Sequence, residues 1–403
     1  MPQDLVLIGG GHSHAIVLKM FGTKPLPGVR LTLISDVSHA PYSGMLPGHV
    51  AGFYSYDECH IDLRSLAEFA GCELVVDRAI AIDFNRSQVI CQNCPPVNFD
   101  LLSVDIGSTP ATLSVPGAAK YAVPAKPVPE FLANWNQLIA WRQNHPEMLL
   151  RIAIVGGGAG GVELALNMQA RLTKEEGRRK REEGRGKKEE KLDKLLEIHL
   201  FHSGDELMPG HNNRVRLRLQ EILVSRGIQL HLMEKVSAIE KTAKLEIASD
   251  SKFPLPDYQI YCQSSLELEC DRIFWVTQAA AANWIEESDL STDEKGFIQV
   301  NDCLQSISHS NVFAAGDIAA MINYPRPKAG VFAVRQGKPL FENLQQFLLG
   351  KPLKPFVPQQ QYLSLIGTAN KSAIASRGSW MWESPLLWYW KDWIDRQFMK
   401  RFR

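Results

Sequence analysis

The feature that most constrains the fold is a glycine-rich turn between a strand and a helix, which occurs twice. The first lies in LIGGGHSHAIVL, residues 7–18, and a further strand is predicted at Val29–Asp36. The second lies in LRIAIVGGGAGGVELALNMQARL, Leu150–Leu172, with the next strand predicted at Glu197–Ser203. A strand, a glycine turn, a helix and a parallel strand form the βαβ unit that binds a dinucleotide. Two such units predict an α/β chain with two doubly wound, Rossmann-like domains.

The second turn has the full GxGxxG spacing, with Gly156, Gly158 and Gly161. The first glycine permits the tight turn, and the second lets the backbone approach the pyrophosphate. The third allows the helix and the strand to pack closely. These three residues are therefore predicted to bind a dinucleotide.

The first turn keeps Gly9 and Gly11 but has His14 where a third glycine is expected. Phosphate binding relies on backbone amides and on the helix dipole, which this change leaves in place. His12 and His14 either approach the bound cofactor or fill the space beside it. The structural role is favoured for His14, whereas both roles stay open for His12, which lies nearer the anion.

An acidic residue that binds the ribose is expected where the second strand of each unit ends. The first unit ends in Ser35 and Asp36, which supplies such an acceptor. The second unit ends in His202 and Ser203, and no acid follows before Asp205. The choice between NADH and NADPH at the second site is therefore open.

Composition bears on whether the protein binds nucleic acid or metal and on where in the cell it lies. Lys plus Arg equals Asp plus Glu, at 44 each, so no global field attracts nucleic acid. The pair Cys91 and Cys94 has no second pair nearby to complete a zinc site, so no metal is predicted. This CxxC is either a hairpin with two thiols or a redox pair. With no apolar run of membrane-spanning length, we expect a cytoplasmic protein, either soluble or peripheral on a membrane surface.

The chain of 403 residues is long enough for two or three domains. We assign residues 1–120 and 297–350 to one discontinuous domain and residues 121–296 to the other. A charged insertion at 174–194 interrupts the second domain and is read as a solvated helix or a disordered segment. Residues 351–403 form a distinct C-terminal segment.

The motifs occur in the order found in the pyridine nucleotide-disulfide oxidoreductase superfamily, which the chain resembles over residues 1–350. They are the first turn, FDLLSVDIGSTP, GGGAGGVELA and NVFAAGDIA. The resemblance implies FAD at the first turn and NAD(P)H at the second. It places Glu163 near the nicotinamide and implies FAD contacts at Gly9, Gly11, Asp36, Gly107, Gly316 and Asp317.

A narrower resemblance is to type II NADH dehydrogenases, especially those associated with selenide water dikinase. GGGHSH, PYSGMLPG at residues 41–48 and RPKAGVFAVRQG at residues 326–337 carry it. It implies that Tyr42–Pro47 and Ala333–Gly337 line the flavin ring. The chain departs from disulfide reductases in lacking a CxxxxC after the first unit. It also departs from the AQxAxQxG pattern linked to quinone, which puts quinone as the acceptor in doubt.

The resemblance implies hydride transfer from NAD(P)H to the flavin, followed by transfer of two electrons to an acceptor such as a quinone. One alternative is a reductase for a soluble acceptor, such as a redox protein or a selenium or sulfur compound. Another is a weakly active flavoprotein that senses NAD(P)H and acts through partners.

The C-terminal residues 386–403 have the pattern of a basic amphipathic helix. Five of the nine tryptophans lie in the last 24 residues, and apolar residues recur at helical spacing. The predicted apolar face comprises Leu387, Trp390, Ile394, Phe398 and Phe402. Such a helix either lies on a membrane surface, packs on the protein's own core or forms a homodimer contact.

Overall fold

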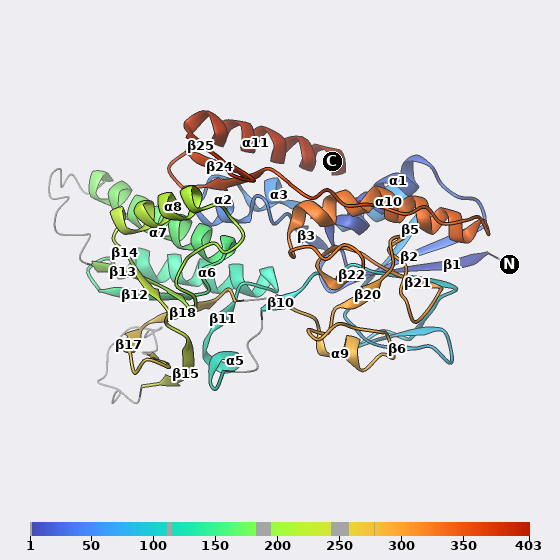
Figure 1. Cartoon of the computed structure of the whole chain (residues 1–403), viewed down its shortest axis with the longest axis horizontal. Coiled ribbons are helices and arrows are strands. Elements are labelled where there is room, and N and C mark those ends of the chain that lie inside the picture. Colours follow the sequence, from blue (N-terminus) through green and yellow to red (C-terminus); the bar gives the residue numbers. More distant parts are fainter. Residues whose placement is uncertain (1, 111–114, 183–194, 243–257, 278) are drawn as a thin grey trace.

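The computed structural model describes residues 2–110, 115–182, 195–242, 258–277 and 279–403 (Figure 1). Its first parallel sheet has the strand order β21-β9-β1-β2-β5. These strands are β1 (Gln3–Ile8), β2 (Val29–Ser35), β5 (Cys72–Val76), β9 (Leu101–Val104) and β21 (Val312–Ala314). Because β21 follows the second glycine unit in the chain, the sheet is built from two separate parts of the sequence, as predicted.

The second parallel sheet has the order β11-β18-β12-β13-β14. These strands are β11 (Val123–Pro124), β12 (Leu150–Val155), β13 (Leu196–His202), β14 (Ile228–Leu232) and β18 (Arg272–Trp275). Its helices are α5 (Ala118–Tyr121), α6 (Val128–Asn144), α7 (Ala159–Glu182) and α8 (Asn213–Ser225). Helix α7 continues through the first part of the charged insertion, and residues 183–194 lie outside the described residues.

Helix α1 (His12–Thr23) packs against α4 (Leu63–Ala70) and α10 (Gly330–Leu348). At the crossing of α1 and α10, a side chain at Gly337 would meet Ile16, so the missing Cβ permits the close approach. The short elements outside the larger sheets are β3 (His39–Pro41), α2 (Leu46–Val50), α3 (Tyr56–Cys59), β4 (His60–Asp62), α9 (Asn283–Glu286), β20 (Ile298–Val300), η3 (Gly316–Ile318) and β22 (Ala319–Met321).

Each parallel sheet is accompanied by a three-stranded antiparallel sheet. The first comprises β6 (Ala79–Asp83), β7 (Gln88–Cys91) and β8 (Val97–Asn98), and the second β15 (Val236–Lys241), β16 (Tyr258–Cys262) and β17 (Glu267–Cys270). Cys91 and Cys94 lie at the β7–β8 hairpin as free thiols, and burial raises the pKa of both. The chain crosses between the parallel sheets where β10 (Thr109–Pro110) pairs with β19 (Ala279–Ala280).

The C-terminal segment forms a third unit, whose sheet and helix lie along one edge of the molecule (red in Figure 1). It comprises an antiparallel sheet of β23 (Ser364–Gly367), β24 (Ala373–Arg377) and β25 (Trp380–Ser384), followed by α11 (Pro385–Met399) and η4 (Lys400–Phe402). Helix α11 begins on β24 and its C-terminal end contacts α1 through η4. Among the described residues, no helix combines the length and apolarity needed to cross a membrane.

The predicted apolar face of this helix is partly wrong. Leu387, Phe398 and Phe402 are buried, whereas Trp390 and Ile394 are 45% and 36% exposed. The face turned toward the protein also carries the polar residues Lys391 and Asp395, because the surface that receives it offers a backbone carbonyl and a tyrosine hydroxyl.

Candidate functional site

The first glycine turn lies at the carboxyl end of β1, against the end of β9. Gly9 has a φ of +95°, and a Cβ at this position would overlap the backbone of Asp105. A Cβ at Gly11 would overlap the Asp105 carboxylate. Only glycine therefore fits at both positions. The N-terminus of α1, whose backbone amides can bind an anion, follows directly after them.

His14 joins this turn to β9. Its imidazole is buried, with Nδ1 donating to the Gly9 carbonyl at 2.7 Å and Nε2 accepting from the Ser103 hydroxyl at 2.8 Å. Burial lowers the pKa of His14 to about 4, so the ring is neutral near pH 7. Because both nitrogens are used within the protein, we infer a structural role for His14.

His12 is arranged differently. Within the described part of the chain, its buried Nε2 has no hydrogen-bond partner. Its ring lies 5.4 Å from that of Tyr42 and 6.2 Å from that of Phe398, and burial lowers its pKa to about 4. Buried polar atoms in proteins are almost always paired. The unpaired nitrogen and the glycine cradle together fit a cofactor that brings its own polar atoms to this turn.

Asp317 lies on the opposite side of the turn, after β21. Its carboxylate accepts from Lys126 Nζ at 3.0 Å and from Ser108 Oγ at 3.2 Å. Burial raises its pKa, but Lys126 and the two hydrogen bonds outweigh burial, so the net pKa is lowered. Gly316, with a φ of +70°, donates its amide to Gln336 Oε1 at 2.7 Å. Gln336 belongs to the predicted segment Ala333–Gly337, whereas Lys126 was not predicted, because it reaches the site only through the fold.

The other residues expected to contact FAD lie at the carboxyl ends of β2 and β9 and in α10. Ser35 is buried and donates to the Val37 carbonyl at 2.9 Å. Asp36 is exposed one place beyond β2, with its carboxylate 3.6 Å from Arg78. Gly107 has a φ of +73°, which forms the turn after β9. Ala333 in α10 accepts from Ser13 Oγ at 2.8 Å, so this part of α10 is tied to α1 beside the turn.

The second turn has the geometry that its glycines predict. Gly156 has a φ of +130°, and a Cβ there would overlap Val276. A Cβ at Gly161 would overlap the Gly156 carbonyl, so this glycine serves the close helix–strand packing. At Gly158, by contrast, a Cβ would meet nothing within 4 Å. At the tip of β13, His202 Nδ1 accepts from the Gly157 amide at 3.3 Å.

Glu163 projects from α7 toward the C-terminal segment, where its Oε1 accepts from the Gly367 amide at 3.0 Å. Burial raises its pKa, although Lys391 and the Gly367 amide favour the charged form. Lys391 Nζ in turn lies 2.6 Å from Asp395 Oδ2 and 2.6 Å from the Gly44 carbonyl. The lysine thus lies between the second glycine unit and the first.

Tyr42 completes the connection to the first turn. Its hydroxyl donates to Asp395 Oδ1 at 3.0 Å, and its ring contacts His12. Burial first, and then Asp395, raise the pKa of Tyr42, so the phenol stays protonated. Pro47 lies in the first turn of α2, in the loop that follows Tyr42. Lys391 and Asp395 were missed from the sequence, where they looked like the solvated residues of an amphipathic helix.

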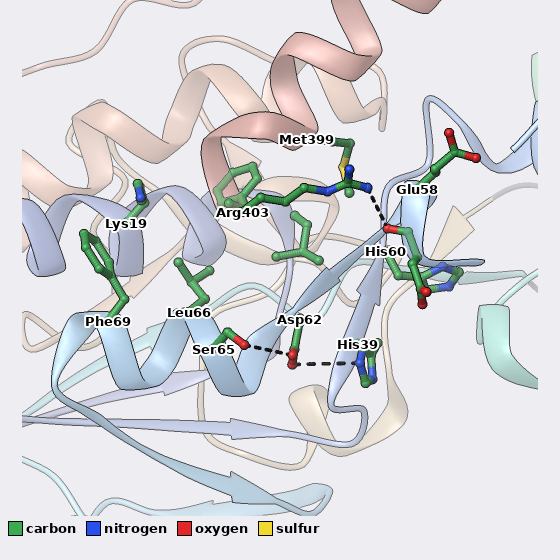
Figure 2. Close-up of a pocket in the computed structure, with 13 residues that line it drawn as sticks. Lys19, His39, Glu58, His60, Asp62, Ser65, Leu66, Phe69, Met399 and Arg403 are labelled. Atoms are coloured by element: carbon green, nitrogen blue, oxygen red, sulfur yellow. Dashed lines mark hydrogen bonds and ion pairs between the residues drawn. The ribbon is translucent and has the colours of Figure 1, made fainter. Parts of the chain in front are cut away.

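A separate cavity of about 570 Å³ lies between α1, α4 and the end of the chain (Figure 2). Leu66, Phe69 and Met399 give it apolar walls, while Asp62 and His39 lie at one end. None of the predicted site residues lines it. The predicted site residues therefore lie outside this cavity.

Comparison with known proteins agrees with this geometry. The sequence profile of the pyridine nucleotide-disulphide oxidoreductases matches residues 3–337. The chain belongs to this family. Its members' chemistry makes it an FAD-dependent NAD(P)H oxidoreductase, and the predicted fold and cofactors are confirmed.

Two relatives and two solved structures illustrate the similarity. The chain is 22% identical over 399 residues to the NADH dehydrogenase-like protein YutJ of Bacillus subtilis, covering 96% of this chain and 99% of that one. It is 24% identical to demethylphylloquinone reductase NdbB of Synechocystis, covering 71% and 64%. NDH2 of Plasmodium falciparum superposes with a TM-score of 0.78 at 14% identity, covering 99% and 97%. Sulfide:quinone oxidoreductase of Aquifex aeolicus gives 0.75 at 15% identity, covering 100% and 91%.

Proposed function

We propose that this enzyme passes hydride from NAD(P)H to FAD and then two electrons to a quinone. The observation that carries the proposal is the partly buried connection from Glu163 through Lys391, Asp395 and Tyr42 to His12. It joins the helix of the second glycine turn to the helix of the first, as a reaction between two bound cofactors requires. Relatives named as quinone reductases support the acceptor.

The flavin supplies the hydride chemistry when it is bound. The protein's residues would bind and orient the two cofactors and exclude water from the site. The amide end of α1 would hold the diphosphate, and Asp317 with Lys126 would hold the neighbouring part of the cofactor. Glu163 would orient the nicotinamide carboxamide. Tyr42 and Asp395 of α11, which are joined by a hydrogen bond, would keep water from the space between the two turns and hold a phenolic proton there.

The proposal predicts the behaviour of the flavin on anaerobic mixing with NADH or NADPH. We expect the flavin absorption near 450 nm to bleach with at least one nucleotide, and a soluble quinone analogue to restore it. Stopped-flow absorption would measure both steps. Persistence of the oxidised spectrum at millimolar concentrations of both nucleotides would contradict hydride transfer. Bleaching without restoration by quinones, but with restoration by a small redox protein, would favour a soluble acceptor.

We further propose that the exposed face of the C-terminal unit contacts a membrane surface. Trp380 and Trp393 are 50% and 59% exposed, and β25 and α11 carry further exposed large apolar side chains. The rest of this face comprises Trp382, Leu386, Tyr389, Trp390 and Ile394. The basic residues Lys400, Arg401 and Arg403 follow α11 in the sequence. An aromatic face with adjacent cations is the composition that lies at the interface of an anionic bilayer.

Replacing Trp390 and Trp393 by serine is expected to lower binding to anionic vesicles at least about tenfold, because it removes apolar area from the contact. Co-sedimentation with vesicles containing phosphatidylglycerol would measure the loss. Ile80→Ser is the matched control, since Ile80 is exposed on β6, away from α11 (Figure 1). Equal binding by all three proteins would remove the membrane contact. A dimer that the double variant dissociates would instead identify the face as a homodimer contact.

A further inference from the structure

The Asp105 carboxylate lies where an anion would bind to α1. Asp105 follows β9 directly, and its side chain is buried. Its Oδ2 accepts from the backbone amides of Ser13 at 2.8 Å and His14 at 3.1 Å. These amides belong to the first turn of α1, whose N–H groups have no partner within the helix. The protein thus places its own acid at the helix end that the family uses for FAD.

Two glycines make the space for this acid. A Cβ at Gly11 would overlap the Asp105 carboxylate, and a Cβ at Gly316 would overlap its Oδ1. Both glycines were predicted from the resemblance to contact FAD. The structure shows that they also enclose Asp105, so a cofactor bound at these glycines would lie beside the acid.

The groups that face Asp105 do not neutralise its charge. From η3, Asp317 is a second acid, and its partner Lys126 is hydrogen-bonded to Asp317. From α1, His12 and His14 are neutral near pH 7, because burial lowers the pKa of each to about 4. Burial raises the pKa of Asp105 to about 7, although the two amides lower it, and Asp317 raises it further. The carboxyl can therefore change its protonation near neutral pH.

We propose that Asp105 is a positioning residue of the FAD turn, and that FAD binds to the form in which this carboxyl is protonated. A diphosphate at the amide end of α1 brings negative charge beside the acid, and like charges favour the neutral form. The protonated carboxyl still keeps α1 in place, because its carbonyl oxygen accepts from the same amides. Binding of FAD above neutral pH then takes up a proton.

The direction of the pH effect follows from linkage. Below pH about 7, Asp105 already carries the proton, so the affinity for FAD is constant. Above that pH, each FAD bound requires a proton, and the Kd rises by up to about tenfold per pH unit. The rise ends where the pH exceeds the pKa of the carboxyl in the FAD complex.

Fluorescence titration of the flavin-free full chain with FAD, between pH 6 and 8.5, tests this inference. We expect the wild-type Kd to rise at least about fivefold over this range. Asp105→Asn retains an oxygen acceptor without the charge, so its Kd is expected to vary less than about twofold and to be lower than wild type at pH 8.5. Asp105→Ala removes the acceptor and is expected to weaken FAD binding at every pH, as loss of a purely structural group would.

Titration calorimetry on the wild type gives a second measurement that needs no variant. In two buffers of different ionisation enthalpy at pH 8, the difference in heat should correspond to uptake of a proton by the complex. A pH-independent wild-type Kd without proton uptake overturns the inference, as does an Asn variant with the wild-type slope. A chain that binds no FAD at any pH would overturn it together with the cofactor assignment. Failure to bleach with NAD(P)H would leave these binding results unchanged, so the two proposals fail separately.

Discussion

Replacing Gly158 by valine is expected to lower the affinity for NAD(P)H about a hundredfold while FAD and the fold are retained. A side chain at this position meets nothing within 4 Å in the protein, so valine adds no internal clash. The second glycine of the fingerprint is where the backbone approaches the pyrophosphate. Added bulk at a close contact costs about 1–3 kcal/mol, and about 2.7 kcal/mol corresponds to a hundredfold.

Binding of ADP-ribose by calorimetry would measure this loss without requiring turnover, and thermal unfolding would verify the fold. Gly160→Val is the matched control, because its Cβ would meet only a side-chain methyl of Val276, at 3.2 Å. Gly161→Val should behave in the opposite way to Gly158→Val, unfolding the second unit by overlap with Gly156. Unchanged ADP-ribose affinity in Gly158→Val would show that the nucleotide does not approach this backbone.

The sequence predicts the two parallel sheets because their signals are local. Strand, glycine and helix follow one another within about 30 residues in a βαβ unit. The glycine positions were therefore found without the fold. Their second role was not, because the contact of Gly11 and Gly316 with Asp105 joins three separate parts of the chain.

The C-terminal helix shows why periodicity alone predicted its buried face only in part. Counting apolar residues assumes that a helix packs on an apolar surface. Here α11 covers the Gly44 carbonyl and the Tyr42 hydroxyl, more than 340 residues earlier in the chain, so Lys391 and Asp395 turn inward. Trp390 and Ile394 are left exposed as a result. The partner surface decides the face, and that surface is known only from the tertiary structure.

Breaking the ion pair of Lys391 and Asp395 in α11 has the largest expected effect on stability. Lys391→Met is expected to lower the free energy of unfolding by about 3–5 kcal/mol, because it leaves a buried carboxylate without its cation. The side chains of Lys391 and Asp395 are only 16% and 6% exposed, so solvent screens the pair little. Urea unfolding monitored by tryptophan fluorescence would measure the change.

The double variant Lys391→Met, Asp395→Leu separates the cost of an unpaired charge from the loss of packing. Replacing a buried ion pair by apolar residues is often close to neutral, so the double variant should recover most of the stability. It also removes the acceptor of the Tyr42 hydroxyl, so the recovery should be incomplete by about 1 kcal/mol. Lys400→Met, an exposed lysine of the same segment, should unfold like the wild type. If Lys391→Met were as stable as Lys400→Met, Lys391 would not be paired beneath α11 in solution, and the connection from Glu163 to Tyr42 would be absent.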